Sequence, residues 1–276
     1  MESQERRQGS RYVVLDEERE RFREEGFIHL PGVLSDEEIQ EIERTYDRFL
    51  NREIDVLGKD FCDMSSDYTA DVENFGIVNI MLPRRYYPEW QDNVYERRAR
   101  SIAEQLCGPG MTLDYDQLLA KGPSRPDAVF PWHQDRAYWI DTEDPRTATC
   151  WLAIDESTTE NGCMRFVSGS HRGDLRPHAP SHGSREESHA LVTELRDDDV
   201  VIDMPIARGD ITVHNERIMH GSGGNQTQGR RRAYIIAFRS ETTVAEERRR
   251  GFTHSHNDAP DILDSVEGQK KPSSDA

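Results

Sequence analysis

The sequence lacks the features that mark secreted, membrane-embedded or zinc-structured proteins. Its four cysteines, Cys62, Cys107, Cys150 and Cys163, are far apart and form no Cys-x-x-Cys pair, so neither a disulfide framework nor a cysteine-rich zinc site is indicated. No apolar run approaches the roughly 18 residues that a membrane span needs. The first twenty residues are too densely charged for a signal peptide. We therefore expect reduced, inert thiols in a cytoplasmic protein with no membrane partner.

Lysine is also scarce, and positive charge is in deficit overall. Only four of the 35 basic residues are lysines, against 53 acidic residues, and the formal net charge is −18. An acidic surface of this kind argues against nucleic acid as a partner. The length of 276 residues fits one large domain. We predict a single domain over residues 1–262, as a monomer or small homo-oligomer, and a disordered segment over 263–276 because its composition is polar.

The N-terminal third has the patterns of helices, and the remainder has those of strands. Residues 17–25 form a charged helical segment, Ser35 and Glu38 form a capping box before an amphipathic helix over 36–51, and residues 88–107 have a second apolar stripe. Short β-prone runs separated by turn residues then follow at 112–120, 129–133, 148–154, 163–167, 200–204, 211–214 and 234–238. The pattern predicts a mainly β fold with flanking helices, built as a sandwich or barrel.

Three residues have the chemistry of a metal site. His133 and Asp135 are two positions apart, so on a strand both side chains leave the same face. His220 precedes the flexible stretch 221–225, which we expect to place it at the end of a strand. Two histidines and one carboxylate form the facial triad of non-haem Fe(II) oxygenases, which leaves positions open for a cosubstrate and O₂.

Other metal ligands are conceivable. His214 lies on a predicted strand and is an alternative to His220, and zinc is an alternative metal, although closed zinc sites usually use four Cys or His ligands. For six other histidines we expect solvated or hydrogen-bonding roles. These are His171, His178, His182 and His189 in a polar stretch, and His254 and His256 in a polar C-terminal segment.

Arg231 is the candidate binding group for an anion. If residues 231–238 form a strand, Arg231 shares a face with Ala233 and Ile235, while Arg230 and Arg232 lie on the other face and are expected to be solvated. An arginine on the inner, apolar face needs an anion, and a carboxylate fits its planar fork. Ser222 can add a hydroxyl to the same carboxylate. This strand register predicts that Arg231 and Ser222 bind a carboxylate beside the metal.

These motifs, with several others in order, resemble the phytanoyl-CoA dioxygenase family of Fe(II)/2-oxoglutarate oxygenases. The resemblance covers about residues 17–240. The matching blocks are His-Gln-Asp at 133–135, Trp-Leu-Ala-Ile-Asp at 151–155, Asn-Gly-Cys at 161–163, Ser-Gly-Ser-His-Arg-Gly at 168–173, Leu-Arg-Pro-His at 175–178 and the stretch from His220 to Arg231. Ser168 stands where the family usually has proline.

The resemblance implies a double-stranded β-helix core, which is the jelly roll of cupin-like proteins. It implies that His133, Asp135 and His220 bind Fe(II), and that the far carboxylate of 2-oxoglutarate meets Arg231 and Ser222. Trp151 and Gln117 match positions that line the cosubstrate pocket. A basic residue of the phytanoyl-CoA enzyme corresponds to Asn79, which is a departure.

The implied activity is hydroxylation of a small molecule, with 2-oxoglutarate and O₂ converted to succinate and CO₂. A non-catalytic or differently reacting member of the same fold is the alternative. A halogenase is disfavoured because halide binding needs the position that Asp135 fills. The sequence does not select the substrate. Candidate aromatic walls are Phe130, Trp132, Tyr138, Trp139 and Phe166, and candidate contacts to an anionic substrate are Arg136, Arg84 and Arg85.

Overall fold

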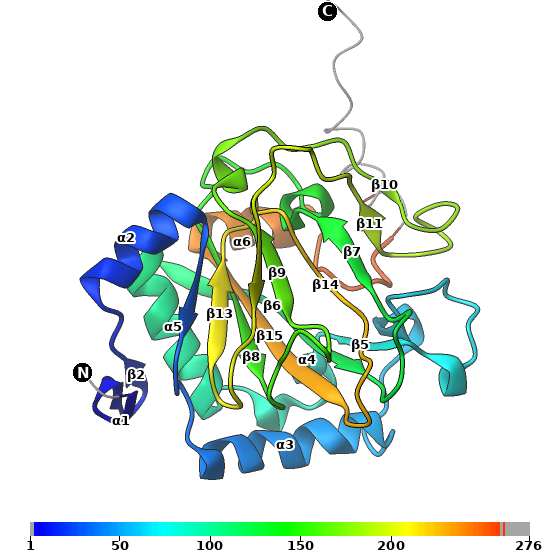
Figure 1. The fold of residues 1–276 in the computed structure, drawn as a ribbon, viewed down its shortest axis with the longest axis horizontal. Coiled ribbons are helices and arrows are strands. Elements are labelled where there is room, and N and C mark those ends of the chain that lie inside the picture. The colour runs from blue at the N-terminus through cyan, green and yellow to red at the C-terminus, as the bar shows by residue number, and fades with distance from the viewer. Residues whose placement is uncertain (1–2, 260–261, 263–276) are drawn as a thin grey trace, which may run out of the picture.

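Two antiparallel sheets face each other and form the centre of the molecule (Figure 1). The computed structural model describes residues 3–259 and residue 262, so the segment 263–276, for which we predicted disorder, lies outside the described residues. The larger sheet has the strand order β3-β13-β8-β15-β6-β5-β4, and the smaller has the order β12-β9-β14-β7. This arrangement is the predicted jelly roll.

The strands are short except for two that run through the middle of the larger sheet, β6 (Met111–Lys121) and β15 (Arg231–Ser240). The other strands of the larger sheet are β3 (Phe27–Leu30), β4 (Phe61–Asp63), β5 (Ile77–Met81), β8 (Thr147–Ala153) and β13 (Ile211–His214). The smaller sheet contains β7 (Phe130–His133), β9 (Met164–Val167), β12 (Val201–Met204) and β14 (His220–Ser222). Two hairpins, β1–β2 (Arg7–Gln8, Arg11–Tyr12) and β10–β11 (Ala179–Pro180, Leu191–Val192), lie outside them.

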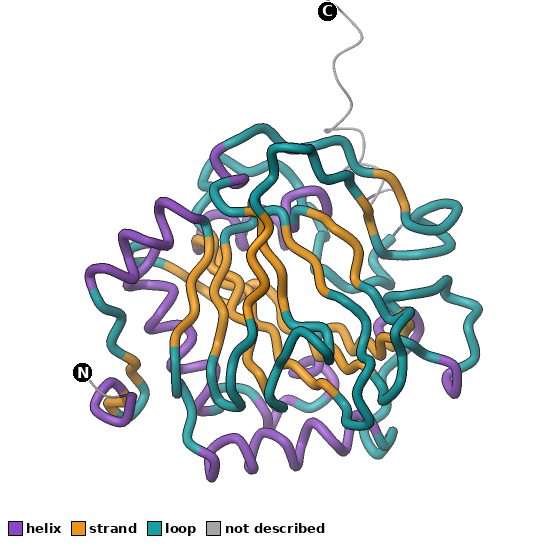
Figure 2. The backbone as a smooth tube through the Cα atoms, in the orientation of Figure 1, coloured by secondary structure: helices purple, strands orange, loops and turns teal. Residues whose placement is uncertain are grey.

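The helices lie outside the two sheets, as Figure 2 shows in purple. They are α1 (Ser3–Arg6), α2 (Asp16–Glu25), α3 (Asp36–Leu50), α4 (Pro83–Tyr86), α5 (Val94–Cys107) and α6 (Glu241–Arg249). Single 3-10 turns cover Gly58–Asp60, Val72–Asn74, Pro88–Trp90, Asp135–Tyr138 and Ser170–Arg172. In the described part of the chain, no helix has the length and apolar character needed to cross a bilayer.

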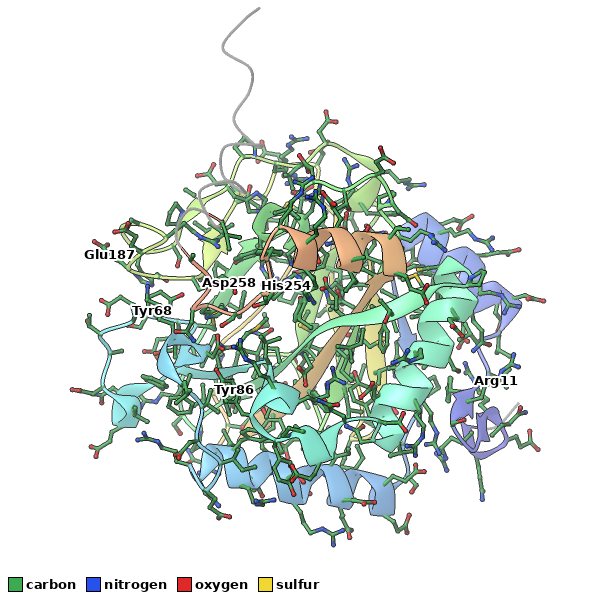
Figure 3. All side chains as sticks on the ribbon, turned by 180° about the vertical axis from the view of Figure 1, so that it is seen from behind. Arg11, Tyr68, Tyr86, Glu187, His254 and Asp258 are labelled. Carbon is green, nitrogen blue, oxygen red and sulfur yellow. The ribbon has the colours of Figure 1, made fainter. Side chains whose placement is uncertain are left out.

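The alternation of side chains along β15 separates two apolar layers. Tyr234, Ile236 and Phe238 face outward and pack with residues of α3 and α5, which cover the outer face of the larger sheet (Figure 3). Ala233 and Ile235 face inward and pack between the sheets. Because successive side chains of a strand point to opposite faces, the same alternation turns Arg231 inward, and its side chain is buried as predicted.

Several predicted boundaries are wrong in physically clear ways. The helix expected over 88–107 begins at Val94, because Asn93 caps it by accepting a hydrogen bond from the Glu96 amide and a separate 3-10 turn precedes it. His220 begins a strand rather than ending one. The capping box of Ser35 and Glu38 is present as predicted. Strands β4 and β5 and helix α6 were not predicted, because the first two are short and the third is mostly charged.

Arg232 is not the solvated residue that the sequence suggested. Its guanidinium donates to Asp155 at 2.7 Å and to Asp47 of α3 at 2.7 Å, and it also pairs with Glu43 of α3. The Arg232 side chain is 11% exposed. It therefore fastens α3 to the outer face of the sheet, while its neighbour Arg231 points to the inner face.

A buried cluster of charges joins β15, β6 and α6. Arg239 is fully buried and pairs with Glu247 of α6 and with Glu216, at 3.3 Å from the latter. Asp114 of β6 accepts from Arg248 at 2.7 Å and lies 2.8 Å from His254. Each charge in the cluster has an opposite charge beside it, as buried ions require.

We expect Arg239→Met to lower the free energy of unfolding by about 3–5 kcal/mol, because it removes the fully buried cation that pairs with two buried carboxylates, Glu216 and Glu247. The measurement is urea denaturation followed by circular dichroism. The matched control is Arg249→Met on the exposed side of α6, where the pair with Glu246 lies in solvent and its loss should matter little. Equal losses in the two variants would contradict the role assigned to the buried cluster.

Candidate active site

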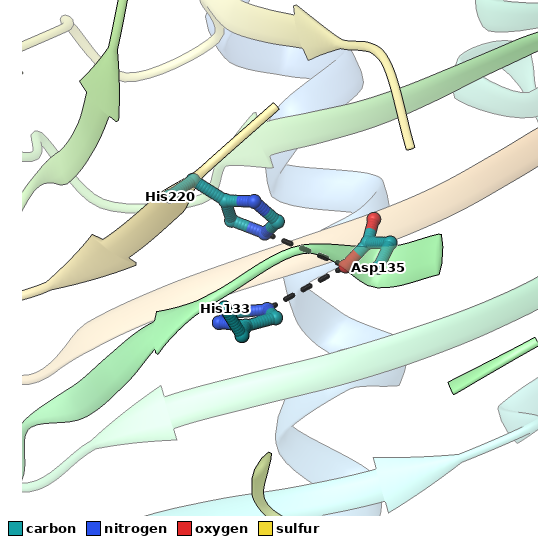
Figure 4. Close-up of side chains that lie close together, drawn as sticks. All are labelled: His133, Asp135 and His220. Carbon is teal, nitrogen blue, oxygen red and sulfur yellow. Dashed lines mark ion pairs between the residues drawn. The ribbon is translucent and has the colours of Figure 1, made fainter. Parts of the chain in front are cut away.

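Three buried side chains converge, two from the paired strands β7 and β14 and one from the turn that follows β7, although the sequence analysis placed Asp135 on a strand with His133 (Figure 4). His133 ends β7 and His220 begins β14, and the register of these strands places the two residues directly opposite each other. Asp135 follows in a 3-10 turn, so β7 has already ended before it. The Asp135 Oδ1 lies 3.5 Å from Nε2 of each histidine. All three are buried, and they have ligand atoms within 4.8 Å of one another, so together they can hold a metal ion.

The imidazole tautomers suit metal binding. Nδ1 of His133 lies 2.8 Å from the Pro131 carbonyl, and Nδ1 of His220 lies 3.0 Å from the Ile218 carbonyl. A carbonyl can only accept, so each Nδ1 donates its proton and each Nε2 keeps a free lone pair. Metal-binding histidines commonly have such a carbonyl partner. The backbone carbonyls therefore fix the tautomer of both imidazoles and leave each Nε2 able to bind a cation.

The second oxygen of Asp135 is held by other residues. Thr149 Oγ1 donates to Asp135 Oδ2 at 3.3 Å, and His214 Nε2 lies 3.3 Å from the same oxygen. His214 is thus close to the site, but the structure places it behind the carboxylate, outside the group of three. The sequence left His214 and His220 as alternatives, and the structure gives them different positions.

The charges of the three residues also favour a cation. Burial acts to raise the pKa of Asp135, but the imidazoles of His220, His133 and His214 hold it well below its usual value. Burial, together with the positive charge of a neighbouring His133, lowers the pKa of His220 well below its usual value. An ionised Asp135 and a neutral His220 are the protonation states that a metal ion requires of these two residues.

A cavity extends from these residues into the space between the sheets. One wall consists of alternate residues of β6 whose side chains point to the same face, namely Gln117, Leu119 and Lys121. Trp151 of β8 and Arg231 of β15 line another. The remaining lining residues are Ile77, Tyr115, Phe130, His133, Asp135, Thr149, Met164, His214, His220, Gly221, Ser222 and Ile235. The cavity thus joins the predicted metal-binding residues to all four predicted cosubstrate-binding residues.

Two buried cations face each other at the far end of this cavity. Arg231 is 2% exposed and Lys121 is 1% exposed, and the register of β15 and β6 pairs them directly. Lys121 Nζ donates to Ser222 Oγ at 2.7 Å and to the Gly223 carbonyl. The Arg231 guanidinium lies over the Trp151 ring, 5.2 Å from its centre, and its Nε has no hydrogen-bond partner among the described residues.

Burial lowers the pKa of both basic side chains. It lowers the pKa of Arg231 to about 10, and burial together with the nearby Arg231 charge lowers the pKa of Lys121 well below its usual value. Like charges directly opposite each other in a sheet are unfavourable. Among the described residues that line the cavity, Asp135 is the sole carboxylate, and it belongs to the metal-binding group. The far end is therefore built for an anion from outside the chain.

Lys121 was missed by the sequence analysis, although a signal was present. It follows Gln117 at an even spacing, one residue beyond the strand predicted over 112–120, and is one of four lysines in an arginine-rich chain. Asn79, where the family has a basic residue, accepts from Gln117 Nε2 at 2.6 Å and is buried. It orients Gln117 instead of providing a charge.

The other substrate-contact candidates have structural roles. Arg136 pairs with Glu216 and with Asp141, and Arg84 pairs with Glu96 at 2.9 Å. Neither arginine lines either of the two cavities beside the metal-binding residues, and Arg85 is exposed.

Three histidines that were expected to be peripheral line a second cavity. These are His189, His254 and His256. His254 and His256 are buried, so they are not solvated, whereas the hydrogen-bonding role expected as the alternative is present in His254, which lies 2.8 Å from Asp114. Phe130, Tyr138 and Trp139 line the same cavity, whereas Phe166 is a core residue between the sheets and Trp132 packs against Arg165.

The arrangement matches proteins of known class. The profile described as phytanoyl-CoA dioxygenase (PhyH) matches residues 22–233. Human peroxisomal phytanoyl-CoA dioxygenase is 23% identical over 238 residues, covering 83% of this chain and 69% of that protein. EvdO2 from Micromonospora carbonacea var. aurantiaca, solved in complex with 2-oxoglutarate, is 30% identical, with a TM-score of 0.67, over 83% of this chain and 91% of that one.

A second similar solved structure supports the fold. The carbocyclase SnoK from nogalamycin biosynthesis, a non-haem α-ketoglutarate-dependent enzyme, is 22% identical with a TM-score of 0.65, over 82% of this chain and 84% of that one. The profile covers most of the chain, and its match agrees with the paired histidines, the buried carboxylate and the cationic cavity described above. The chain belongs to the phytanoyl-CoA dioxygenase family of Fe(II)/2-oxoglutarate-dependent oxygenases.

Proposed function

We propose that this protein hydroxylates a small molecule, and that His133, Asp135 and His220 bind Fe(II) while 2-oxoglutarate occupies the cavity between the sheets. Bound iron with 2-oxoglutarate supplies the oxidising chemistry, with succinate and CO₂ as coproducts. The chain's own contribution is to bind, orient and shield the reactants.

The pair of opposed cations is the observation that carries the proposal. Lys121 and Arg231 are buried at one end of a cavity whose other end is the metal-binding group. A molecule with an anionic group at each end meets both requirements, since one end reaches the metal and the other reaches the cations. Arg231 offers a planar fork to the far carboxylate, and Ser222 and Lys121 offer further donors.

The remaining lining residues fix the orientation of the cosubstrate. Trp151 forms a flat wall beneath the Arg231 guanidinium, and a cation over an aromatic face is attracted to it. Gln117, held by Asn79, presents its amide near the metal end. The exclusion of water from this cavity strengthens each charge-assisted contact.

Among the reactions of this fold, the metal-binding residues disfavour halogenation, and hydroxylation is the outcome that we propose. Asp135 occupies the position that must be vacant for a halide, which opposes halogenation. The fold alone does not choose the reaction, since SnoK is a carbocyclase. Product analysis by mass spectrometry, with ¹⁸O₂ as the oxidant, distinguishes a hydroxylated product from a cyclised or desaturated one.

We expect anaerobic addition of Fe(II) and 2-oxoglutarate to the wild-type protein to produce the weak visible charge-transfer band of a metal-bound 2-oxoacid. His133→Ala, Asp135→Ala and His220→Ala should each abolish the band while circular dichroism shows a folded protein. His214→Ala is the matched control, because it removes a partner of Asp135 and not a ligand; iron binding should weaken by about 10–100-fold without loss of the band. Retention of the band in His220→Ala with its loss in His214→Ala would show that the distal ligand is His214.

A second prediction concerns the two cations. Arg231→Ala should raise the half-saturating 2-oxoglutarate concentration by a factor on the order of 10² or more, because two charge-assisted contacts are lost. Arg231→Lys should restore part of the affinity, since an ammonium cannot reproduce the planar fork. Lys121→Met should raise the same concentration by about tenfold.

The pH dependence isolates Lys121. Because burial lowers its pKa, rising pH should remove its charge, so the half-saturating concentration should rise with pH in the wild type. The Lys121→Met variant should not show that rise. Arg230→Ala is the control, since Arg230 is exposed and its loss should leave the value unchanged. A larger effect in Arg230→Ala than in Arg231→Ala would contradict the assignment.

A further inference from the structure

Three polar side chains lie in a row across one edge of the larger sheet. Strands β6, β5 and β4 are neighbours there, with β4 at the edge. Cys62 of β4 is directly opposite Asn79 of β5, and Gln117 of β6 is paired with Met81, two positions after Asn79. Because residues two apart on a strand share a face, these side chains all lie on the same face. The strand register alone therefore brings them within reach of one another.

Hydrogen bonds connect the three side chains and continue to a fourth. Gln117 Nε2 donates to Asn79 Oδ1 at 2.6 Å, and Asn79 Nδ2 donates to Cys62 Sγ at 3.4 Å. Cys62 Sγ lies 3.6 Å from Nδ1 of His256, in the segment 252–258 that follows α6. Asn79 is fully buried, and Cys62 and His256 are 3% and 4% exposed. We call these four residues the polar row.

The end of the polar row at His256 is firmly held. Asp60 accepts from the His256 amide at 2.7 Å and from Ser255 Oγ at 2.8 Å. Asp60 also accepts from the Tyr86 hydroxyl at 2.7 Å. The His256 ring stacks on the ring of His189, with 3.6 Å between ring centres. Both the backbone and the ring plane of His256 are thus fixed by neighbours outside the row.

His256 also sets the direction of the hydrogen bonds. Burial lowers the pKa of His256 to about 3, so at neutral pH its imidazole carries one proton. The Lys59 backbone acts to raise that pKa, as a carbonyl does when it accepts the imidazole proton. Nδ1 is then left to accept from the Cys62 thiol. A thiol that donates to His256 accepts from Asn79 Nδ2, which turns Asn79 Oδ1 toward Gln117.

The other end of the polar row lies at the metal-binding residues. Gln117 lines both cavities that border His133 and Asp135. An amide can turn by 180° and exchange its oxygen with its NH₂ group at almost no change in shape. Asn79 Oδ1 accepts only from Nε2, so the row selects one of the two orientations. Nε2 keeps a second N–H, which remains available to a ligand.

The polar character of the row is not needed to stabilise the fold. Cys62 belongs to an apolar cluster with Met64, Ile77, Ala128 and Ala190. Buried polar groups that pair with one another contribute little net free energy, and apolar side chains of similar shape can replace them at little cost. A fully paired buried network does, however, impose a single arrangement on its members. The row therefore has the properties expected of a device that orients Gln117.

We propose that Asn79 and Cys62 are positioning residues that connect the fixed His256 to Gln117, so that the Gln117 amide meets 2-oxoglutarate in one orientation. This inference rests on the proposed function, in which Gln117 contacts the cosubstrate. Neither Asn79 nor Cys62 lines either cavity beside the metal-binding residues. Their effect on the cosubstrate must therefore pass through Gln117.

The test is a set of double-mutant cycles on cosubstrate binding. 2-Oxoglutarate is titrated anaerobically into the Fe(II) protein, and the charge-transfer band gives the half-saturating concentration. Cys62→Ala and Asn79→Leu should each raise this concentration by about three- to tenfold, because one hydrogen bond to the cosubstrate is weakened. Gln117→Ala should raise it at least as much. When Gln117→Ala is already present, neither of the other substitutions should raise it further, since the effects of coupled residues are not additive.

Two further variants separate orientation from packing. Cys62→Ser should restore part of the affinity lost in Cys62→Ala, because a hydroxyl both donates and accepts as the thiol does. Cys150→Ala is the matched control, since Cys150 is fully buried in the apolar cluster on the outer face of the larger sheet. It removes the same thiol volume and should leave the half-saturating concentration unchanged.

A second readout needs neither iron nor cosubstrate. In ¹H–¹⁵N spectra of the metal-free protein, the side-chain amide signal of Gln117 is identified by its loss in Gln117→Ala. Cys62→Ala should shift this signal, although Asn79 stands between the two residues. Cys150→Ala should leave it in place.

The outcomes separate this inference from the proposed function. If the band forms but Cys62→Ala and Asn79→Leu bind 2-oxoglutarate like the wild type, the positioning role is overturned. The same holds if their effects persist in the Gln117→Ala background, or if Cys150→Ala has an equal effect. Absence of the band in the wild type overturns the proposed function. The Gln117 signal of the metal-free protein then decides whether the polar row orients this side chain.

Discussion

The antiparallel pairing of β14 with β7 is the interaction on which the metal-binding geometry depends. It sets His220 directly across from His133, 87 positions earlier in the chain. Backbone carbonyls close to the same two strands accept hydrogen bonds from the Nδ1 atoms of both rings. A shift of the strand pairing by one residue would turn one imidazole to the opposite face of the sheet. The turn that carries Asp135 begins where β7 ends, so the carboxylate inherits its position from the same register. Local backbone pairing thus determines the chemistry.

The larger sheet contributes a constraint of the opposite kind, since it holds two like charges against each other. Arg231 and Lys121 are paired in register and buried, an arrangement that reduces stability until an anion enters. Elsewhere the protein neutralises buried charge internally, as around Arg239. The buried charges around Arg239 therefore stabilise the fold, whereas we propose that Arg231 and Lys121 bind a ligand. Binding sites often retain such unfavourable arrangements, which natural proteins offset elsewhere.

Sequence periodicity predicted most of the sheet and the inward direction of Arg231, because alternation along a strand is a local property. Periodicity could not choose between His214 and His220 as the second histidine of the metal site, because the pairing of distant strands depends on the whole fold. Lys121 escaped notice because the predicted strand stopped at residue 120, one position before it, and its even spacing from Gln117 was not followed further. Residues 252–258 were misjudged for a different reason: they have no apolar period, and their burial depends on contacts with Asp60 and Asp114, more than 130 positions away in sequence. The metal-binding and cosubstrate roles of the residues remain predictions.

The location of residues 252–258 has a consequence for how members of the family can differ. The family profile ends at residue 233, whereas this segment follows α6 and lines a second cavity beside His133 and Asp135. The paired strands that carry His133 and His220 are thus distant in sequence from one wall of that cavity. Insertions or substitutions at 252–258 can reshape this wall while the paired strands stay intact.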